Sequence, residues 1–193
     1  MTFNDLSSPL ALLGSRRSAK PRDMVAPGPD DTQLDAMLAI ATRTPDHGKL
    51  APWRFVVVDT ERRDAFAALL RTAFSKQKPA AEDFELEAAE QFARQAPTLV
   101  IALSAPNPAS HIPLWEQELS AGAAVMNLLH AATAMGFGAA WLTGWAAYDE
   151  TVREAVAEPG ERVAGFIFIG TPGRPLDERP RPKAEQVIRH WGA

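Results

Sequence analysis

The chain of 193 residues contains no cysteine. This absence excludes a disulfide framework, zinc ligation by thiolates and a cysteine nucleophile. An excess of basic residues is also missing, because the formal net charge is -4 and the pI is about 5.6. Nucleic-acid-binding proteins normally present a clustered basic surface, so we expect no nucleic-acid partner. Any anionic ligand must therefore be held by a local group of basic residues.

Long apolar runs and targeting features are lacking as well. The most apolar stretch is interrupted by Asn127 and His130, so no segment is expected to span a membrane. The residues up to Ser18 hold no long apolar run and end close to two arginines, which argues against a signal peptide. Together with the absence of cysteine, these features fit a cytoplasmic location.

Expected helices and strands follow one another without strict alternation. The helices are expected at about Pro9–Arg16, Thr32–Thr42, Glu61–Phe74, Ala81–Arg94, Leu114–Met135 and Asp149–Ala157. The strands are expected at Arg54–Asp59, Thr98–Leu103, Gly138–Thr143 and Arg162–Ile169. The segment Ala19–Asp31 and the tail from Thr171 onward are expected to be irregular. Two or more helices separate the strands in places, which favours an α+β sandwich over a doubly wound sheet. No linker is evident, so residues 1–193 are expected to form one domain.

The expected helix Leu114–Met135 is the most apolar of all. Ala121–Met126 and Leu128–Ala134 leave little polar face, so the helix should be buried nearly all round. A small domain has little surface to cover such a helix on every side. A second copy of the chain can supply that surface, so we expect a homodimer.

Two adjacent arginines follow the first expected helix. In Arg16-Arg17-Ser18, two guanidinium groups and a hydroxyl can grip a phosphate through charge-assisted, bidentate hydrogen bonds. The competing interpretation is a basic helix C-terminus that complements the helix dipole, which is common. On these residues alone, the second interpretation is favoured.

A second group of donors lies in the segment Arg43–Trp53. Two prolines and a glycine predict a rigid turn between a helix and a strand, from which Arg43, His47 and Lys49 present donors. Such donors suit a ligand with several carbonyl and hydroxyl acceptors. The competing interpretation, favoured for any single residue, is a surface turn whose Trp53 fills the core.

Other chemical motifs are weak or missing. Gly136-Phe137-Gly138 lacks the third glycine of a dinucleotide fingerprint and lies between a helix and a strand, which is the reverse order. The four histidines are scattered without metal-ligand spacing, so no metal is expected. Glu116 and Glu118 are two positions apart on a helix and face different ways, so no catalytic carboxylate pair is expected. His130, on an apolar helix, is interpreted as a hydrogen-bonded core residue.

Taken in order, these pieces resemble the nitroreductase family, most closely its small YdjA-type subgroup. The resemblance covers roughly Leu10 to Pro172. The family's Arg-Arg-Ser-x-basic motif is matched by Arg16 to Lys20, and its Arg-x-Pro…Gln-Pro-Trp-x-Phe segment is similar to Arg43–Phe55. The remaining similar segments are the Trp115-Glu116-Gln117-Glu118 helix, the Trp141-Leu142-Thr143-Gly144 strand, the closing strand Gly165–Pro172 and the subgroup's turn Pro45-Asp46-His47.

The resemblance implies a nitroreductase-like sandwich, with a central, mostly antiparallel sheet flanked by helices, in an intertwined homodimer with FMN at the interface. FMN carries the chemistry, so no catalytic side chain is implied. The phosphate and ribityl chain are assigned to Arg16, Arg17 and Ser18, with tail contacts from Arg179 and Arg181. The flavin ring is assigned to Arg43, His47 and Lys49 and to Trp141, Leu142 and Thr143, with Arg43 and His47 coming from the other subunit. A nicotinamide nucleotide is assigned to Ala131, Ala132, Thr133, Ala134, Met135 and Gly136.

The sequence departs from the family pattern at three of its positions. Lys49 stands where the wider family often has asparagine, and Ala51 where it often has glutamine. Leu142 replaces an arginine that is expected in the subgroup. These changes affect the expected contacts to the flavin but leave the phosphate-binding arginines in place.

The function implied is that of an FMN-dependent oxidoreductase. Hydride passes from NADH or NADPH, through the bound flavin, to a nitroaromatic, a quinone or a similar small electron-poor acceptor in a ping-pong cycle. Two alternatives stay open. One is a flavin carrier without turnover, and the other is a family member with a different flavin reaction, of the dehalogenase or flavin-destructase type.

Overall fold

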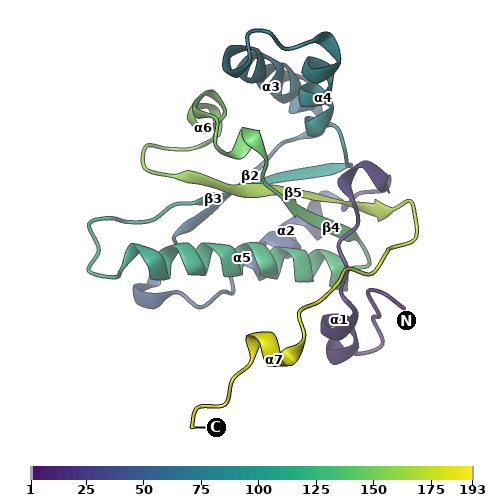
Figure 1. The fold of residues 1–193 in the computed structure, drawn as a ribbon, viewed down its shortest axis with the longest axis vertical. Coiled ribbons are helices and arrows are strands. Elements are labelled where there is room, and N and C mark those ends of the chain that lie inside the picture. The colour runs from purple at the N-terminus through teal and green to yellow at the C-terminus, as the bar shows by residue number, and fades with distance from the viewer. Residues whose placement is uncertain (1, 193) are drawn as a thin grey trace.

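The computed structural model describes residues 2–192 and contains the expected mixture of helices and strands (Figure 1). The helices are α1 (Pro9–Ser15), α2 (Asp31–Ala41), α3 (Arg63–Gln77), α4 (Asp83–Ala93), α5 (Leu114–Ala134), α6 (Glu150–Val156) and α7 (Ala184–Val187). The strands are β1 (Met24–Val25), β2 (Trp53–Val57), β3 (Thr98–Ser104), β4 (Gly138–Leu142) and β5 (Arg162–Pro172).

The strands form one sheet in which β5 is the central element. The order is β1-β5-β3-β2, and β4 also pairs with β5. Every one of these pairings is antiparallel. This arrangement confirms the α+β class and the antiparallel central sheet expected from the sequence.

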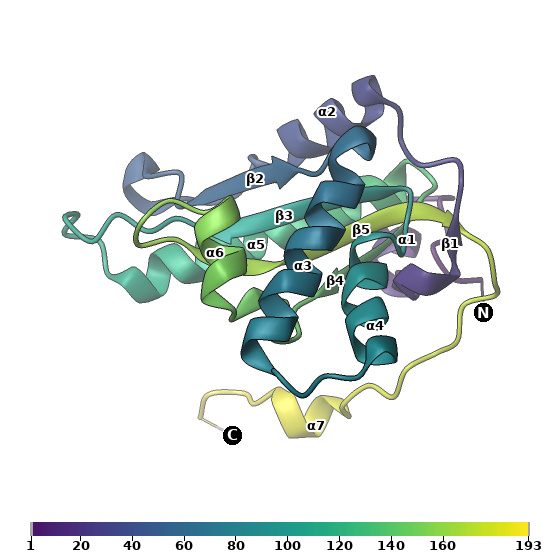
Figure 2. The same ribbon diagram turned by 90° about the horizontal axis from the view of Figure 1, so that it is seen from above.

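Helices cover both faces of the sheet, and strand residues alternate between two cores. Leu99, Ile101, Phe166 and Phe168 point to the side of α3 and α4. Their neighbours in the strands, including Val100 and Ile167, point to the side of α2 and α5. Figure 1 shows the resulting layers, with α3, α4 and α6 above the strands and α5 below them. Figure 2 shows α3 and α4 lying side by side across the sheet.

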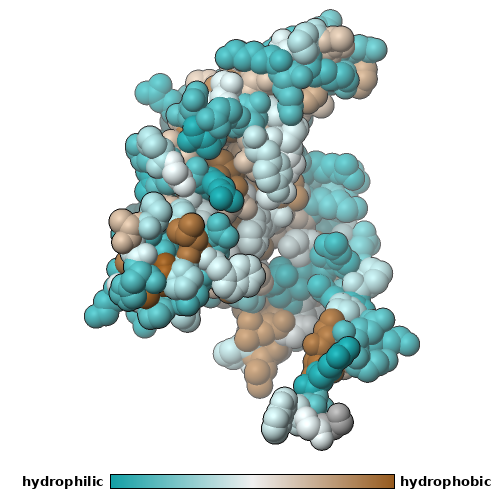
Figure 3. All heavy atoms as spheres, turned by 60° about the vertical axis from the view of Figure 1, so that its left-hand side comes forward, coloured by the Kyte–Doolittle hydropathy of each residue, from teal (hydrophilic) through white to brown (hydrophobic). Residues whose placement is uncertain are grey.

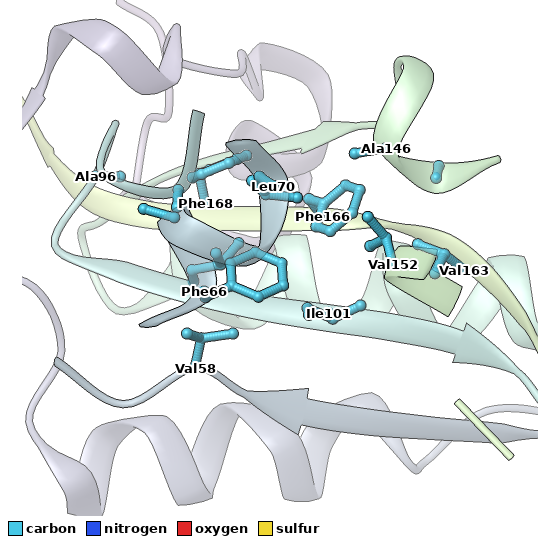
Figure 4. Packing of buried hydrophobic residues seen from close by; sticks show 14 of the residues in the cluster. Val58, Phe66, Leu70, Ala96, Ile101, Ala146, Val152, Val163, Phe166 and Phe168 are labelled. Carbon is cyan, nitrogen blue, oxygen red and sulfur yellow. The ribbon is translucent and has the colours of Figure 1, made fainter. Parts of the chain in front are cut away.

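The core on the α3–α4 side is rich in aromatic residues. Figure 4 shows Phe66 and Leu70 of α3 pointing toward Phe166 and Phe168 of β5. Phe92 of α4 meets both β5 rings edge-on, at centroid distances of 5.2 and 5.3 Å. Such edge-to-face pairs add to the stabilisation from buried area.

Most expected elements are confirmed, with local corrections. Ser8 caps α1 through its hydroxyl, and Pro9 begins the helix as expected. The helix expected from Glu61 is preceded by a 3-10 turn (Thr60–Arg62), and α3 starts only at Arg63. Two further expectations were wrong. The segment expected to be an irregular loop contains β1, and the last strand continues to Pro172, because the two segments pair with each other.

Helix α5 is not buried all round within one chain. Its inner face is packed in the core, with Val125 and Leu129 exposed by only 1% and 3%. On its outer face, Trp115 is 67% and Leu119 53% exposed, and Ala123 is also exposed. The expectation of all-round burial is therefore wrong for the single chain.

The C-terminal segment projects from the body. Residues 177–192 are exposed throughout and include the large apolar residues Val187, Ile188 and Trp191. Figures 1 and 2 show α7 and the chain end standing away from the sheet, and Figure 3 shows hydrophobic side chains on this projection. Within residues 2–192, no helix combines the length and apolarity that a membrane crossing needs.

Candidate functional site

The two adjacent arginines follow α1 and diverge from each other. Helix α1 ends at Ser15 with Arg16 as its C-cap residue, so neither arginine belongs to its last turn. The Arg16 guanidinium donates a hydrogen bond of 3.3 Å to the Ser18 hydroxyl. Arg17 instead donates through Nε to the Asp177 carbonyl, at 2.7 Å. Arg16 and Ser18 thus form one group, while Arg17 holds the start of the tail.

Arg16 is half-buried among other cations. Burial lowers the pKa of its guanidinium, and the charges of Arg181 and Arg17 lower that pKa further. Within residues 2–192, no carboxylate lies within ion-pair distance of Arg16. Arg16 also lies close enough to α5 to lower the pKa of His130, although burial is the larger cause of that shift. Among the described residues, Arg16 itself therefore has no compensating carboxylate.

The tail contributes one arginine to this corner. Arg181 approaches Arg16, and its own ion-pair partner is Glu178, at 3.7 Å. Glu178 also lies 3.9 Å from Arg17, so it links the tail to the arginine pair. The Arg179 guanidinium makes no hydrogen bond or ion pair within the described chain, since only its backbone N–H bonds to Glu178. Beside Arg17 lies a pocket of about 160 Å³, lined by Ser18, Lys20, Arg174 and Asp177 among others.

The segment from Arg43 to Trp53 is fixed to α5 by three polar side chains of that helix. Glu116 bonds to His47 Nδ1 at 2.7 Å, and the Ser120 hydroxyl donates to the Pro45 carbonyl at 2.6 Å. Asn127 donates to the Thr44 hydroxyl at 2.8 Å. The exposed side chains of Arg43, His47 and Lys49 are therefore presented from a segment anchored at several points.

This segment also contains an unusual backbone. Gly48, Lys49 and Ala51 have φ values of 80°, 55° and 48°. Lys49 and Ala51 carry side chains in the left-handed region, which costs conformational energy and often marks functional segments. Trp53, at the end of the segment, is buried against Ala121 and Ala124, as the surface-turn interpretation expected for this residue.

Trp141 of β4 lies across two glycines. Its Nε1 donates to the Ala164 carbonyl at 2.9 Å, and a Cβ added at Gly165 would lie 2.1 Å from that nitrogen. The far edge of the ring reaches Gly122 of α5. Trp141 is 38% exposed and Thr143 is also exposed, while Leu142 packs against the core.

The stretch expected to contact a nicotinamide nucleotide is largely internal. Ala131, Ala132 and Thr133 are at most 3% exposed, and the Thr133 hydroxyl donates to its own helix at Leu129. Only the end of the stretch, Ala134 to Gly136, reaches the surface. Any nucleotide contact here must therefore use the end of α5.

Within one chain, the candidate residues fall at different levels of α5. Arg16 lies near His130, the Trp141 ring reaches Gly122, and His47 is bound to Glu116. Glu116 and His130 are about 21 Å apart along the helix axis at 1.5 Å per residue. The single chain therefore does not bring Arg16 and His47 together.

The family follows from comparison with known proteins. The family model described as "Nitroreductase family" matches residues 13–171. The chain belongs to the nitroreductase family. Over 164 residues, which are 84% of this chain and 87% of its relative, it is 35% identical to YdjA of Escherichia coli strain K12, a protein provisionally named an NAD(P)H nitroreductase. The resemblance noted in the sequence is thereby confirmed.

Solved structures of this nitroreductase-like fold match nearly the whole chain. A nitroreductase-like family protein from Bacillus cereus matches with a TM-score of 0.80 at 19% identity, covering 100% of this chain and 99% of its own. A variant of the FMN and NADPH-dependent nitroreductase NfnB from Sphigopyxis sp. strain HMH gives a TM-score of 0.70 at 20% identity, and covers 94% and 97%. An iodotyrosine deiodinase bound to FMN and 3-iodo-L-tyrosine gives 0.67 at 20% identity, with the same coverage.

Several residues of the site were missed by the sequence interpretation. Glu116 was considered only as half of a carboxylate pair with Glu118. Asn127 was counted only as an interruption of an apolar stretch, and Ser120 was not considered. The spacing of Glu116, Ser120 and Asn127 places all three on one helix face, and this periodicity was the available signal. Glu178 carried no signal, because its role depends on where the tail folds.

Proposed function

We propose that this nitroreductase-family protein is an FMN-dependent oxidoreductase that passes hydride from NADH or NADPH to small electron-poor acceptors in a ping-pong cycle. The observation that carries the proposal is the half-buried Arg16, which lies beside Arg17, Arg181 and the Ser18 hydroxyl and has no carboxylate partner within the described residues. A phosphate supplies the missing charge and the hydrogen-bond acceptors. The corner therefore suits the phosphorylated end of FMN.

The placement of Trp141 supports the same ligand. The Trp141 ring reaches α5 at Gly122, eight positions before His130, which is about 12 Å along the helix. A phosphate at Arg16 and a ring system at Trp141 can thus belong to one elongated molecule that follows the outer face of α5. Thr143, exposed beside this strand, and the backbone of Leu142 border the same space.

A homodimer completes this site. If the outer face of α5 packs antiparallel on the same helix of a second copy, the start of one helix meets the end of the other. The partner subunit's His47 then borders the same elongated site as Arg16 of the first chain. Ala123, the midpoint between Glu116 and His130, is exposed and small, as close packing of two helices requires. The projecting tail, with Ile188 and Trp191 exposed, is a second surface for the partner to cover.

When bound, FMN supplies the ability to accept and donate a hydride. In this proposal, Arg16, Ser18 and Arg181 bind the phosphate, and Trp141 shields one edge of the ring from water. Lys49 or Arg43, both exposed cations, would stabilise negative charge on the bound flavin. The reductant and the acceptor occupy the same space in turn, and the acceptor is a nitroaromatic, a quinone or a similar small molecule.

The first experiment is an absorption spectrum of the purified protein, with and without added FMN. We expect a yellow protein whose flavin band bleaches anaerobically with NADH or NADPH and returns when a quinone or nitroaromatic compound is added. A colourless protein that does not take up FMN contradicts the proposal.

Two other flavin functions give different results in the same experiment. The deiodinase with this fold is bound to FMN and an iodinated amino acid, so an iodinated phenol is a justified second acceptor. Release of iodide without turnover of quinones would favour a dehalogenating reaction. A bound flavin that neither nicotinamide nucleotide reduces would favour the flavin carrier.

A further inference from the structure

His47 and Glu116 form a contact that the proposed function leaves without a role. His47 Nδ1 and Glu116 Oε2 are 2.7 Å apart. Both side chains are largely exposed, at 64% and 43%. Exposed ion pairs and hydrogen bonds contribute little to folding stability. Stability therefore gives a weak reason for holding this histidine in one orientation.

The surroundings of His47 show that its position is nevertheless tightly fixed. The segment that carries it is attached to α5 through Ser120 and Asn127 as well as through Glu116. These three residues occupy one face of α5 at helical spacing. The Ala51 N–H also donates to Asp46 Oδ2 at 2.7 Å, which closes the turn around His47.

The backbone next to His47 is held in an unfavourable conformation. Lys49 and Ala51 adopt left-handed φ values that side chains rarely take. Strain of this kind persists where surrounding contacts over-determine the conformation, and such positions gather at ligand-binding segments. The contacts from α5 therefore hold this segment so that the side chains of His47 and Lys49 point outward.

The chemistry of the contact fixes the histidine's tautomer. An ionised carboxylate offers only hydrogen-bond acceptors, so His47 Nδ1 must carry the proton in this contact. The neutral ring then presents Nε2 as an acceptor, and the protonated ring presents it as a donor. In both states, Nε2 is the atom left for a ligand.

We propose that Glu116 is a positioning residue that holds His47 as the Nδ1–H tautomer and directs Nε2 at the ligand in the site. The ligand class is a planar heteroaromatic molecule with polar edge atoms, which Nε2 can meet as acceptor or donor. The role of this nitrogen rests on the proposed flavin site. The tautomer itself is a property of this chain without any ligand.

The first test is the tautomeric state of His47 in the flavin-free protein, measured by long-range ¹H–¹⁵N NMR at a pH where the ring is neutral. His47 is assigned by comparison with H47Q. We expect the Nδ1–H form in the wild-type protein and its loss in E116Q, because a glutamine amide can donate as well as accept. The matched control is E118Q, since Glu118 is on the same helix but pairs with Arg162 at 3.8 Å. A wild-type His47 in the Nε2–H form, or an unchanged E116Q spectrum, overturns the proposal.

The second test separates positioning from folding. H47Q places a polar atom near the position of Nε2, whereas H47N places one near Nδ1. We expect H47Q to retain more FMN affinity than H47N, and E116Q to weaken FMN binding severalfold in the wild-type background but not in H47N. Equal affinities of H47Q and H47N, or an equal effect of E116Q in both backgrounds, contradict the positioning role. If the wild-type protein binds no FMN, the proposed function fails, while the NMR result still decides the tautomer.

Discussion

The two sides of the central sheet differ in how completely residues of the same chain cover them. On the side of α3 and α4, a core with Phe166 and Phe168 fully buried is closed by helices of the same chain. Arg63 is buried there as well, and it donates to the carbonyls of Ala93 and Ala96 at 2.8 and 3.0 Å. Its guanidinium thereby satisfies backbone groups at the end of α4.

The α5 side has an equally closed inner core but an open outer face. Trp115 and Leu119 are exposed on that face, and the groups around Arg16 and His47 lie beside it. Polar side chains therefore have different roles on the two sides of the sheet. On the closed side, Arg63 completes the fold, whereas on the open side Arg16 lacks a carboxylate partner within the described residues.

The largest expected effect is damage to the closed side. Phe168→Ala removes a fully buried ring that meets Phe92 edge-on, and we expect unfolding to become easier by about 3–5 kcal/mol. Urea denaturation measures the change. The control is Phe84→Ala, because Phe84 is 65% exposed and its loss should change stability by less than about 0.5 kcal/mol. Similar losses in both variants would mean that the aromatic core is not the main support of this side.

The second prediction tests the two faces of α5 directly. Ala123→Arg puts a charge on the outer face, so we expect sedimentation to show a monomer with native circular dichroism and weakened FMN binding. Val125→Arg puts the same charge into the inner core, where Val125 is 1% exposed, and this variant should fail to fold. Leu129 is likewise only 3% exposed, so a charge at either core position tests folding and not assembly. A dimeric Ala123→Arg variant with full FMN affinity would refute the antiparallel α5 arrangement.

The third prediction concerns the arginines. Arg16→Ala removes the half-buried cation, and we expect the Kd for FMN to rise about tenfold or more, as the loss of charged hydrogen bonds implies. Arg17→Ala should have a smaller effect, because Arg17 is engaged with the tail at Asp177. Fluorescence titration of FMN measures both. Arg62→Ala is the matched control, since Arg62 is exposed in the turn before α3 and lies outside the proposed site. A larger effect at Arg17 than at Arg16 would reverse the assignment of the phosphate group.

The helices and strands that are defined by hydrophobic periodicity and by capping residues or prolines were predictable from the sequence. The buried strand β3 and the capped helix α1 follow from apolar runs, a serine cap and an N-terminal proline. The short strand β1 could not be predicted, because Met24–Val25 is a strand only through its pairing with Thr171 and Pro172. The end of β5 was not foreseen as a strand for the same reason, because its strand conformation depends on pairing with β1.

The candidate site was predictable in its parts but not in its geometry. The Arg16-Arg17-Ser18 motif marked the cationic corner, yet adjacency in sequence concealed that the two guanidinium groups point to different partners. His47 was identified, whereas its partner Glu116 was not, because helical spacing marks a polar face of α5 but does not show which segment, 69 positions away, packs on it. Sequence patterns identify which donors are present, and only the packing of distant segments decides which of them act together.

The smallest expected effect lies where the cationic corner meets α5. His130 is partly buried, its Nδ1 has no hydrogen-bond partner within residues 2–192, and burial followed by the Arg16 charge lowers its pKa below the ordinary 6.5. The interpretation of His130 as a hydrogen-bonded core residue is therefore wrong for Nδ1. Below pH 6.5 the unfolded chain takes up a proton that the folded chain resists, so this residue makes the fold less stable as the pH falls.

His130→Gln should remove that part of the pH dependence. Thermal denaturation between about pH 5 and 8 measures it, and we expect the variant to lose less stability on acidification, by a few degrees in Tm at most. Added inorganic phosphate sharpens the test, because an anion at Arg16 offsets the charge that disfavours protonated His130. Phosphate should therefore reduce the acid sensitivity of the wild-type protein and have a smaller influence in Arg16→Ala. An identical pH profile for wild-type protein and His130→Gln would show that the open side tolerates the protonated histidine without cost.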